Sequence, residues 1–314
     1  MSGASNGATF DPHEPILDAR QVGACLYVPA VRDLDAVVRG ERLAEIASVI
    51  FCTEDSIDES DLPRALENLR SALARLEPIP DRYRFVRVRN PWVLDRVLEM
   101  PGSERLSGFV LPKVHAGNFP EYWSRLEHTS HAFMPTLETR EAFSEAAMVA
   151  LREKLSDDKI RQRVTCLRIG GNDLLSLLGL RRPRGKTVYQ TPVGDVIARL
   201  VTWFRPWGFQ LAAPVFEYLD DAGTLAEELE IDRDWGLCPK AAIHPDQVAR
   251  IEEFYRVHRS ELDAAVRILE AGSRAVFRFQ DSMCEPATHL NWARTVVMAA
   301  DRFGTRTADP ADAA

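Results

Sequence analysis

The stretch HAFMPTLETR, residues 131–140, shows the pattern on which our interpretation of the whole chain rests. Residues 131–137 form an apolar, β-rich run, and Glu138 then places a charge at the point where a buried strand ends. Thr139 begins a segment with the pattern of a helix. An unpaired carboxylate is costly in a protein core. Whether Glu138 has a functional role therefore depends on whether other strands of this chain end in the same way.

Eight apolar runs of this kind follow one another along the chain, with helix-like segments between them. Most are apolar on successive residues, which is typical of parallel strands that are covered on both faces. Their ends recur 24 to 45 residues apart, at Pro29, Glu54, Arg89, Lys113, Glu138, Gly171, Phe216 and Ile243. Because a βαβ unit takes roughly 30 residues, this series predicts an α/β fold, a (β/α)₈ TIM barrel.

The barrel accounts for most of the chain but not for all of it. We predict a flexible N-terminal arm over residues 1–20, the barrel over 21–258, a C-terminal helical extension over 259–304 and a flexible tail over 305–314. The extension contains two helix-like segments, residues 260–277 and 287–303. We expect it to cap the barrel or to pack on a neighbouring subunit.

The composition limits which binding partners and which cellular compartment we expect. Of the 314 residues 46% are hydrophobic, and the net charge of −8 argues against nucleic acid or an anionic membrane as the partner. No apolar run approaches the roughly 20 residues of a membrane helix, and the N-terminus lacks the pattern of a signal peptide. The five cysteines form no C-x-x-C pair, which suits reduced thiols. We therefore expect a cytoplasmic protein that acts on a small molecule.

Charged residues collect at the predicted strand ends, where TIM barrels carry their active sites. They are Glu54, Asp55, Arg87, Arg89, Lys113, Glu138, Asp173, Lys240 and His244. Glu138 and Asp173 follow adjacent strands, and two carboxylates with open water positions suit Mg²⁺. A nearby arginine could pair with a substrate carboxylate or stabilise an oxyanion.

Each of these residues also has a structural interpretation. Asp173 could be the N-cap of the helix that follows it, and Glu138 could favour the start of its own following helix. The acidic segment 54–61 could be a solvated loop. Arg87 and Arg89 alternate with valines, so one should face the barrel interior and the other the exterior, where we expect an ion pair.

Seven motifs in order resemble those of the HpcH/HpaI aldolase and citrate lyase β-subunit superfamily. They are LYVPA (26–30), VIFCTEDS (49–56), VRVRN (86–90), LPKV (111–114), TLET (136–139), RIGGNDLLSLLG (168–179) and KAAIHPDQV (240–248). The likeness spans about residues 22–250 and is strongest to the citrate-lyase-β-like branch, whose relatives include malyl-CoA and citramalyl-CoA lyases.

The resemblance implies a chemistry and a set of roles. Glu138 and Asp173 would bind Mg²⁺, and Arg87 would contact substrate together with Glu138 and Lys113. We expect Glu54 and Asp55 to act with Arg87 in catalysis. The implied activity is that of a magnesium-dependent C–C bond lyase or aldolase. It would form or quench an enolate of a hydroxy acid, keto acid or acyl-CoA. The resemblance also implies a homo-oligomer, a trimer or a hexamer.

The chain departs from the family pattern at three places. Cys52 replaces the first acid of a DLED motif, Pro239 replaces a glycine before Lys240, and Glu285 stands where relatives with thioesterase activity carry an aspartate. Two alternatives therefore stay open. One is a barrel that binds or regulates without turnover, and the other is a lyase for a sugar acid or another acid without coenzyme A.

Overall fold

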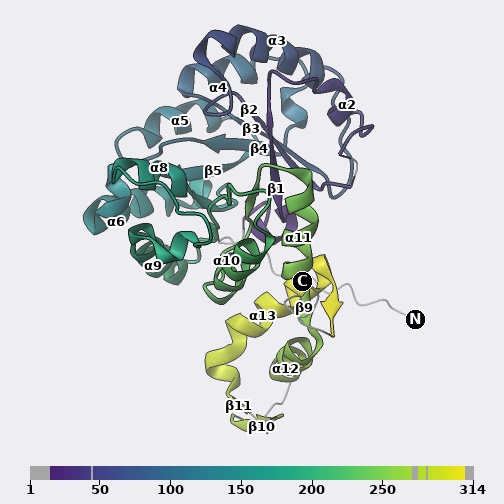
Figure 1. The fold of residues 1–314 in the computed structure, drawn as a ribbon, viewed down its shortest axis with the longest axis vertical. Helices are drawn as coiled ribbons and strands as arrows, with labels where there is room; N and C mark the ends of the chain where they lie inside the picture. Colours follow the sequence, from purple (N-terminus) through teal and green to yellow (C-terminus); the bar gives the residue numbers. More distant parts are fainter. Residues whose placement is uncertain (1–14, 44, 271–274, 281, 308–314) are drawn as a thin grey trace.

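Eight parallel strands form the centre of the protein (Figure 1). The computed structural model describes residues 15–43, 45–270, 275–280 and 282–307. The strands are β1 (Cys25–Pro29), β2 (Ser48–Cys52), β3 (Tyr83–Arg87), β4 (Gly108–Leu111), β5 (Ala132–Leu137), β6 (Leu167–Ile169), β7 (Leu211–Ala212) and β8 (Ala241–Ala242). Their order is β7-β6-β5-β4-β3-β2-β1-β8, and a parallel bridge between Ala213 and Lys240 joins the two outer strands. The sheet closes, and the predicted (β/α)₈ barrel is confirmed.

One short helix precedes β1 and packs Ala19 and Val22 with the side chains inside the barrel, and the other helices follow the strands and cover the outside (Figure 1). The helices are α1 (Ala19–Val22), α2 (Asp35–Val38), α3 (Leu62–Leu73), α4 (Pro91–Leu98), α5 (Phe119–Leu126), α6 (Glu145–Leu155), α7 (Asp158–Arg161), α8 (Gly171–Leu177), α9 (Pro192–Phe204), α10 (Ala222–Asp234) and α11 (Pro245–Tyr255). The short 3₁₀ turns are η1 (Glu59–Asp61), η2 (Ser103–Arg105), η3 (Arg140–Phe143), η4 (Val188–Gln190) and η5 (Arg205–Trp207). Several helices start on a capping residue followed by proline, as at Asn90 before α4 and Thr191 before α9.

The core has two layers, which explains why the strands are apolar on successive residues. Side chains such as Phe51 and Phe133 pack between the strands and the surrounding helices. Their neighbours Ile50 and Met134 fill the inside of the barrel. Because successive strand residues point to opposite faces, both sets must be apolar.

The C-terminal extension is a separate layer of structure beside the barrel (Figure 1). It contains β9 (Val257–His258), α12 (Arg259–Leu269), the hairpin of β10 (Phe277–Phe279) and β11 (Ser282–Cys284), α13 (Pro286–Phe303) and β12 (Thr305–Arg306). Helices α12 and α13 pack on each other around Ala265 and Ala293. The first of the two predicted helices is too long, because α12 ends at Leu269 and Phe277 belongs to the hairpin.

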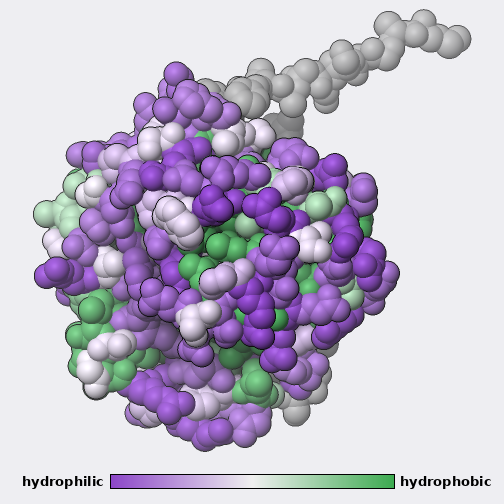
Figure 2. All heavy atoms as spheres, turned by 90° about the horizontal axis from the view of Figure 1, so that it is seen from above, coloured by the Kyte–Doolittle hydropathy of each residue, from purple (hydrophilic) through white to green (hydrophobic). Residues whose placement is uncertain are grey.

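The predicted domain boundaries remain predictions. Residues 1–14 of the proposed arm and 308–314 of the proposed tail lie outside the described residues. Hydrophilic residues cover most of the face shown in Figure 2, with smaller hydrophobic groups between them. No described helix combines the length and the hydropathy that crossing a membrane requires. All five cysteines are free thiols.

Candidate functional site

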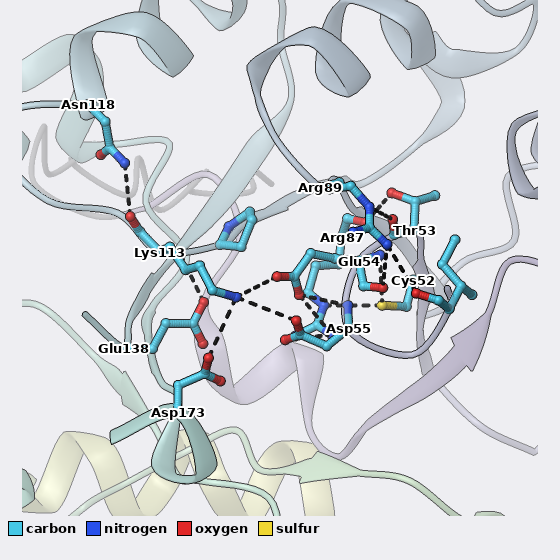
Figure 3. Close-up of polar contacts among 12 residues, drawn as sticks. Cys52, Thr53, Glu54, Asp55, Arg87, Arg89, Lys113, Asn118, Glu138 and Asp173 are labelled. Atoms are coloured by element: carbon cyan, nitrogen blue, oxygen red, sulfur yellow. Dashed lines mark hydrogen bonds and ion pairs between the residues drawn. The ribbon is translucent and has the colours of Figure 1, made fainter. Parts of the chain in front are cut away.

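The structure brings five of the predicted site residues together at the carboxyl ends of β2 to β6 (Figure 3). They are Glu54 after β2, Arg87 at the end of β3, Lys113 after β4, Glu138 after β5 and Asp173 in the first turn of α8. Asp55 adjoins this group through Arg87 and Lys113. Because parallel strands end at the same face of a barrel, residues far apart in the sequence meet here.

Lys113 lies at the centre of the acidic groups. Its Nζ is 2.5 Å from Glu54 Oε1 and 3.6 Å from Asp173 Oδ1, and its backbone N–H donates to Glu138 Oε1 at 2.8 Å. The backbone of Lys113 is left-handed, with a φ of 52°, a conformation that costs a non-glycine residue about 1–3 kcal/mol. Asn118 stabilises this turn by donating to the Lys113 carbonyl at 2.9 Å. The strained turn is what lets the N–H face Glu138 while the ammonium reaches the other acids.

Arg87 is held from several sides at the edge of the same group. Its Nη2 is 3.1 Å from Glu54 Oε2 and 3.5 Å from Asp55 Oδ2. Its Nε donates to Cys52 Sγ at 3.2 Å, and the guanidinium lies over the Tyr27 ring at 5.0 Å. Cys52 is therefore a buried neighbour that orients Arg87. Glu54 forms ion pairs with both Arg87 and Lys113, so it is not a solvated loop residue.

Glu138 and Asp173 carry more negative charge than their surroundings neutralise. Burial, and next the charge of Asp173, raise the pKa of Glu138 to about 7, although Lys113 acts in the opposite direction. Burial likewise raises the pKa of Asp173. Gly170 lies against Glu138, and a Cβ at this position would overlap the carboxylate. Glycine at position 170 thus allows the buried Glu138 carboxylate to lie directly against the end of β6.

These two acids fit a magnesium ion in part. Both are hard oxygen donors that follow adjacent strands, and burial raises the pKa of each, so a bound cation would stabilise their charged forms. In the described part of the chain no group of three or more histidine, cysteine, aspartate or glutamate side chains is arranged to hold a metal. Waters and substrate oxygens would have to complete the coordination.

A cavity of about 400 Å³ opens over this group. Its lining includes Tyr27, Arg87, Glu138, Arg168, Asp173 and Ile243. A larger hollow of about 960 Å³ lies around the other end of the strands, where Tyr83, Thr165 and Trp207 are found. We place the chemistry in the smaller cavity because the opposed carboxylates and the Arg87 guanidinium face it.

The structural alternatives for two of these residues can now be compared with the geometry. Helix α8 has Gly170 as its N-cap and no side-chain cap, so Asp173 does not cap it and points to Lys113 instead (Figure 3). Arg89 follows the end of β3 and is not among the residues that line the cavity. The expected alternation between an inward and an outward arginine does not apply, because residues two apart in a strand share a face and β3 ends at Arg87. The expected ion pair is wrong as well, because Arg89 donates to the carbonyls of Thr53, Glu54 and Ile57.

Two charged residues near the eighth strand lie away from the site. Lys240 is fully buried on the outer side of the barrel, where Nζ is 3.0 Å from Glu228 Oε1 and 2.7 Å from Asp232 Oδ2 of α10. His244 is the N-cap of α11 and accepts from the Asp246 N–H. Arg182, in the segment between α8 and η4, is also buried and pairs with Glu228 at 2.9 Å. Lys240 and Arg182 therefore connect α10 to its neighbours, and His244 caps α11, so none of the three lines the cavity.

Sequence reasoning missed Arg168 and Tyr27, which both line the cavity. Arg168 lies in β6 and is 3% exposed. The signal was present, because an arginine within the otherwise apolar run VTCLRIGG is unusual for a buried strand. Arg168 lies one position inside β6, whereas the predicted site residues all lie at or after strand ends.

Comparison with known proteins gives the same fold and a consistent set of relatives. The family model described as C–C bond lyase of the TIM-barrel fold matches residues 16–305. A (3S)-malyl-CoA thioesterase of Cereibacter sphaeroides (strain ATCC 17025) is 26% identical over 253 residues, which are 80% of this chain and 82% of that protein.

Solved structures resemble the chain at lower identity and show the fold. Protein CitE of Mycobacterium tuberculosis, in complex with magnesium, acetoacetate and coenzyme A, superposes with a TM-score of 0.63 at 24% identity. The match covers 90% of this chain and 99% of CitE. RipC of Yersinia pestis superposes with a TM-score of 0.60 at 19% identity, over 78% of this chain and all of RipC.

Proposed function

The chain belongs to the C–C bond lyase family of the TIM-barrel fold, and from this premise we propose that it is a magnesium-dependent lyase or aldolase. The substrate would be a small carboxylic acid, free or as a coenzyme A thioester, that reacts through an enolate. The observation that carries the proposal is the pair of neighbouring acids, the buried Glu138 and the partly buried Asp173, which line a cavity together with Arg87. The resemblance of the chain to CitE, which was solved with magnesium, supports the choice of metal.

Each residue of the site has a role that follows from its contacts. Glu138 and Asp173 would hold Mg²⁺, which supplies Lewis-acid stabilisation to a substrate carbonyl oxygen. When a C–C bond next to a carbonyl breaks, its electron pair moves toward the carbonyl oxygen, and Arg87 is placed to donate a hydrogen bond there. Glu54 and Asp55 fix the guanidinium of Arg87, and Lys113 fixes Glu54. Cleavage and condensation use the same arrangement in opposite directions.

Proton transfer at the substrate carbon needs a further group. Glu54 is the strongest candidate, because burial raises the pKa of this carboxyl group and a raised pKa favours general acid–base work near neutral pH. Asp55 is half exposed, and the hydrogen bond with Glu54 and the charges of Arg87 and Lys113 lower its pKa. The two neighbouring acids are thus separated in their proton affinity, as an acid–base pair requires.

The experiment that tests this proposal is magnesium-dependent exchange of deuterium into the α-carbon of acetyl-CoA, propionyl-CoA and pyruvate. We expect exchange into at least one of them by the wild type and its loss in Glu138→Gln. Glu145→Gln, the same change on α6 away from the cavity, is the matched control and should keep the wild-type rate. Exchange into a thioester would place the substrate among the acyl-CoA compounds, and exchange into pyruvate alone would indicate a keto acid. No exchange in any of them would refute the lyase assignment for these classes.

We also propose a cytoplasmic homo-oligomer, a trimer or a hexamer. The five free thiols support the compartment. The oligomer is supported by large apolar side chains that the extension leaves exposed, such as Val276, Met283 and Trp292. Light scattering on the purified protein would test it, and a mass of one chain would contradict it.

A further inference from the structure

Arg168 is a buried cation at the floor of the cavity. In the register of the sheet it is opposite Thr136 of β5, two residues before Glu138. Two strand residues span roughly 7 Å, so Arg168 lies one layer of side chains below the acids. Thr136 and Arg168 both line the cavity. A ligand that enters between Glu138 and Asp173 and extends inward therefore meets this guanidinium.

The surroundings of Arg168 are unusual for a buried arginine. Its Nη1 donates to Met134 Sδ at 3.7 Å, and its guanidinium lies over the Tyr27 ring at 5.4 Å, beside the Cys25 thiol. Within the described residues it forms no ion pair with a carboxylate.

Two other buried arginines of the chain have carboxylate or carbonyl partners. Arg182 lies against the carboxylates of Glu228 and Glu217. Arg163 donates to the carbonyls of Leu126 and His131 at 2.6 to 2.8 Å. The fold therefore supplies strong acceptors where a buried guanidinium has only a structural role, and it supplies none at Arg168.

Such a charge is costly unless something else neutralises it. Sulfur atoms are weak acceptors, and an arginine does not lose its proton in a protein. The desolvation of an unpaired ion costs several kcal/mol. Arg87, the other cation against Tyr27, is already matched by Glu54 and Asp55. Among the described residues that line the cavity, Arg168 is thus a cation without a carboxylate partner, and a ligand anion would supply its counter-charge.

We propose that Arg168 binds a second carboxylate of the substrate, at the end remote from the oxygens held near Glu138 and Asp173. The substrate class is then a dicarboxylic hydroxy or keto acid, in which Arg168 selects the acid by its distal group. A single guanidinium balances the one negative charge of a carboxylate and matches its planar geometry. A phosphate would bring up to two charges and leave one uncompensated. This inference rests on the proposed function for the placement of the first carboxylate.

The test compares two stable acids that differ in one carboxylate, malate and lactate. Calorimetric titration in magnesium chloride should show that the wild type binds malate about 10- to 100-fold more tightly than lactate, the value of one or two charge-assisted hydrogen bonds. Arg168→Met should remove this preference and leave lactate binding within about twofold. Arg96→Met, the same change at an exposed position of α4, should keep the preference.

Thermal unfolding without metal gives a second, independent result. Arg168→Met removes an unpaired buried charge, so its melting temperature should equal or exceed that of the wild type. Arg163→Met leaves several carbonyl acceptors unpaired, so its melting temperature should fall. A fall in Arg168→Met as large as that in Arg163→Met would show a structural role and overturn the proposal.

Failure of this inference differs from failure of the proposed function. Equal binding of malate and lactate by the wild type would overturn the role of Arg168, and so would an unchanged preference for malate in Arg168→Met. In either case magnesium-dependent lactate binding or deuterium exchange would still support the lyase assignment. If magnesium has no effect on either acid, the proposed function fails. The role of Arg168 is then decided by metal-free thermal shifts with malate and lactate, where equal shifts, or no shifts, overturn it.

Discussion

Replacing Lys240 by methionine should strongly destabilise the protein, although Lys240 lies outside the catalytic cavity. The ammonium is fully buried and neutralises two carboxylates, Glu228 and Asp232. Glu228 would keep Arg182 and the Val188 N–H, at 2.9 and 2.8 Å. Asp232 would keep only the Tyr189 hydroxyl among its described hydrogen bonds. One uncompensated charge remains, and removing one partner of a buried ion pair costs about 3–5 kcal/mol.

The pH dependence of this loss has a defined sign. Burial raises the pKa of Asp232 to about 6 in the wild type, while Lys240 holds it down. Without Lys240 the pKa rises further, and each additional unit is about 1.4 kcal/mol. An aspartate whose pKa is higher in the folded chain binds more protons when folded, so stability falls as pH rises from its unfolded value. The deficit of Lys240→Met should therefore be smallest near pH 5 and grow toward pH 8.

The assay is urea unfolding at pH 5, 6, 7 and 8, followed by tryptophan fluorescence. Lys154→Met, at an exposed position of α6, is the matched control and should stay within about 0.5 kcal/mol of the wild type. The double variant Lys240→Met/Asp232→Asn should recover the pH-dependent part. A loss below about 1 kcal/mol, or a deficit that is the same at pH 5 and pH 8, would refute the reasoning.

Two further predictions concern the site. Gly170→Ala should displace the Glu138 carboxylate and lower the rate of deuterium exchange by about 100-fold. Gly223→Ala, where a Cβ meets open space, is the control and should leave the rate unchanged. Equal rates in the two variants would contradict the close contact between Gly170 and Glu138. Arg87→Lys should lower the kcat of exchange by about 100-fold or more with a smaller effect on KM, because one ammonium cannot contact Glu54, Cys52 and the substrate oxygen together. Steady-state kinetics measure this, and an effect on KM alone would assign Arg87 to ground-state binding.

The barrel could be predicted from the sequence because its signals are local and repeated. Each strand is a short apolar run, and each run ends on a turn and a helix, as at Glu138 and Thr139. In a closed parallel barrel every strand ends at one face. The spacing of the ends therefore indicated which charges meet, although not which of them would contact Lys113.

Three features were not predicted, for different physical reasons. Lys240 faces outward because Glu228 and Asp232 lie four residues apart on a buried face of α10, and nothing near Lys240 in the sequence indicates these partners. The helix expected over 260–277 ends already at Leu269, and Phe277 and Phe279 belong to a hairpin whose partner strand follows later in the chain. Arg168 is a charged residue in the middle of β6, whereas the residues predicted for the site are at or after strand ends.

Calorimetric titration of Mg²⁺ in the presence of pyruvate tests whether Glu138 and Asp173 together bind the magnesium ion of the reaction. We expect one ion per chain for the wild type and for Glu145→Gln. Affinity should be at least about tenfold weaker in Glu138→Gln and in Asp173→Asn, because each variant removes one charged oxygen ligand. Equal affinity in all four proteins, or no binding by the wild type, would contradict the account.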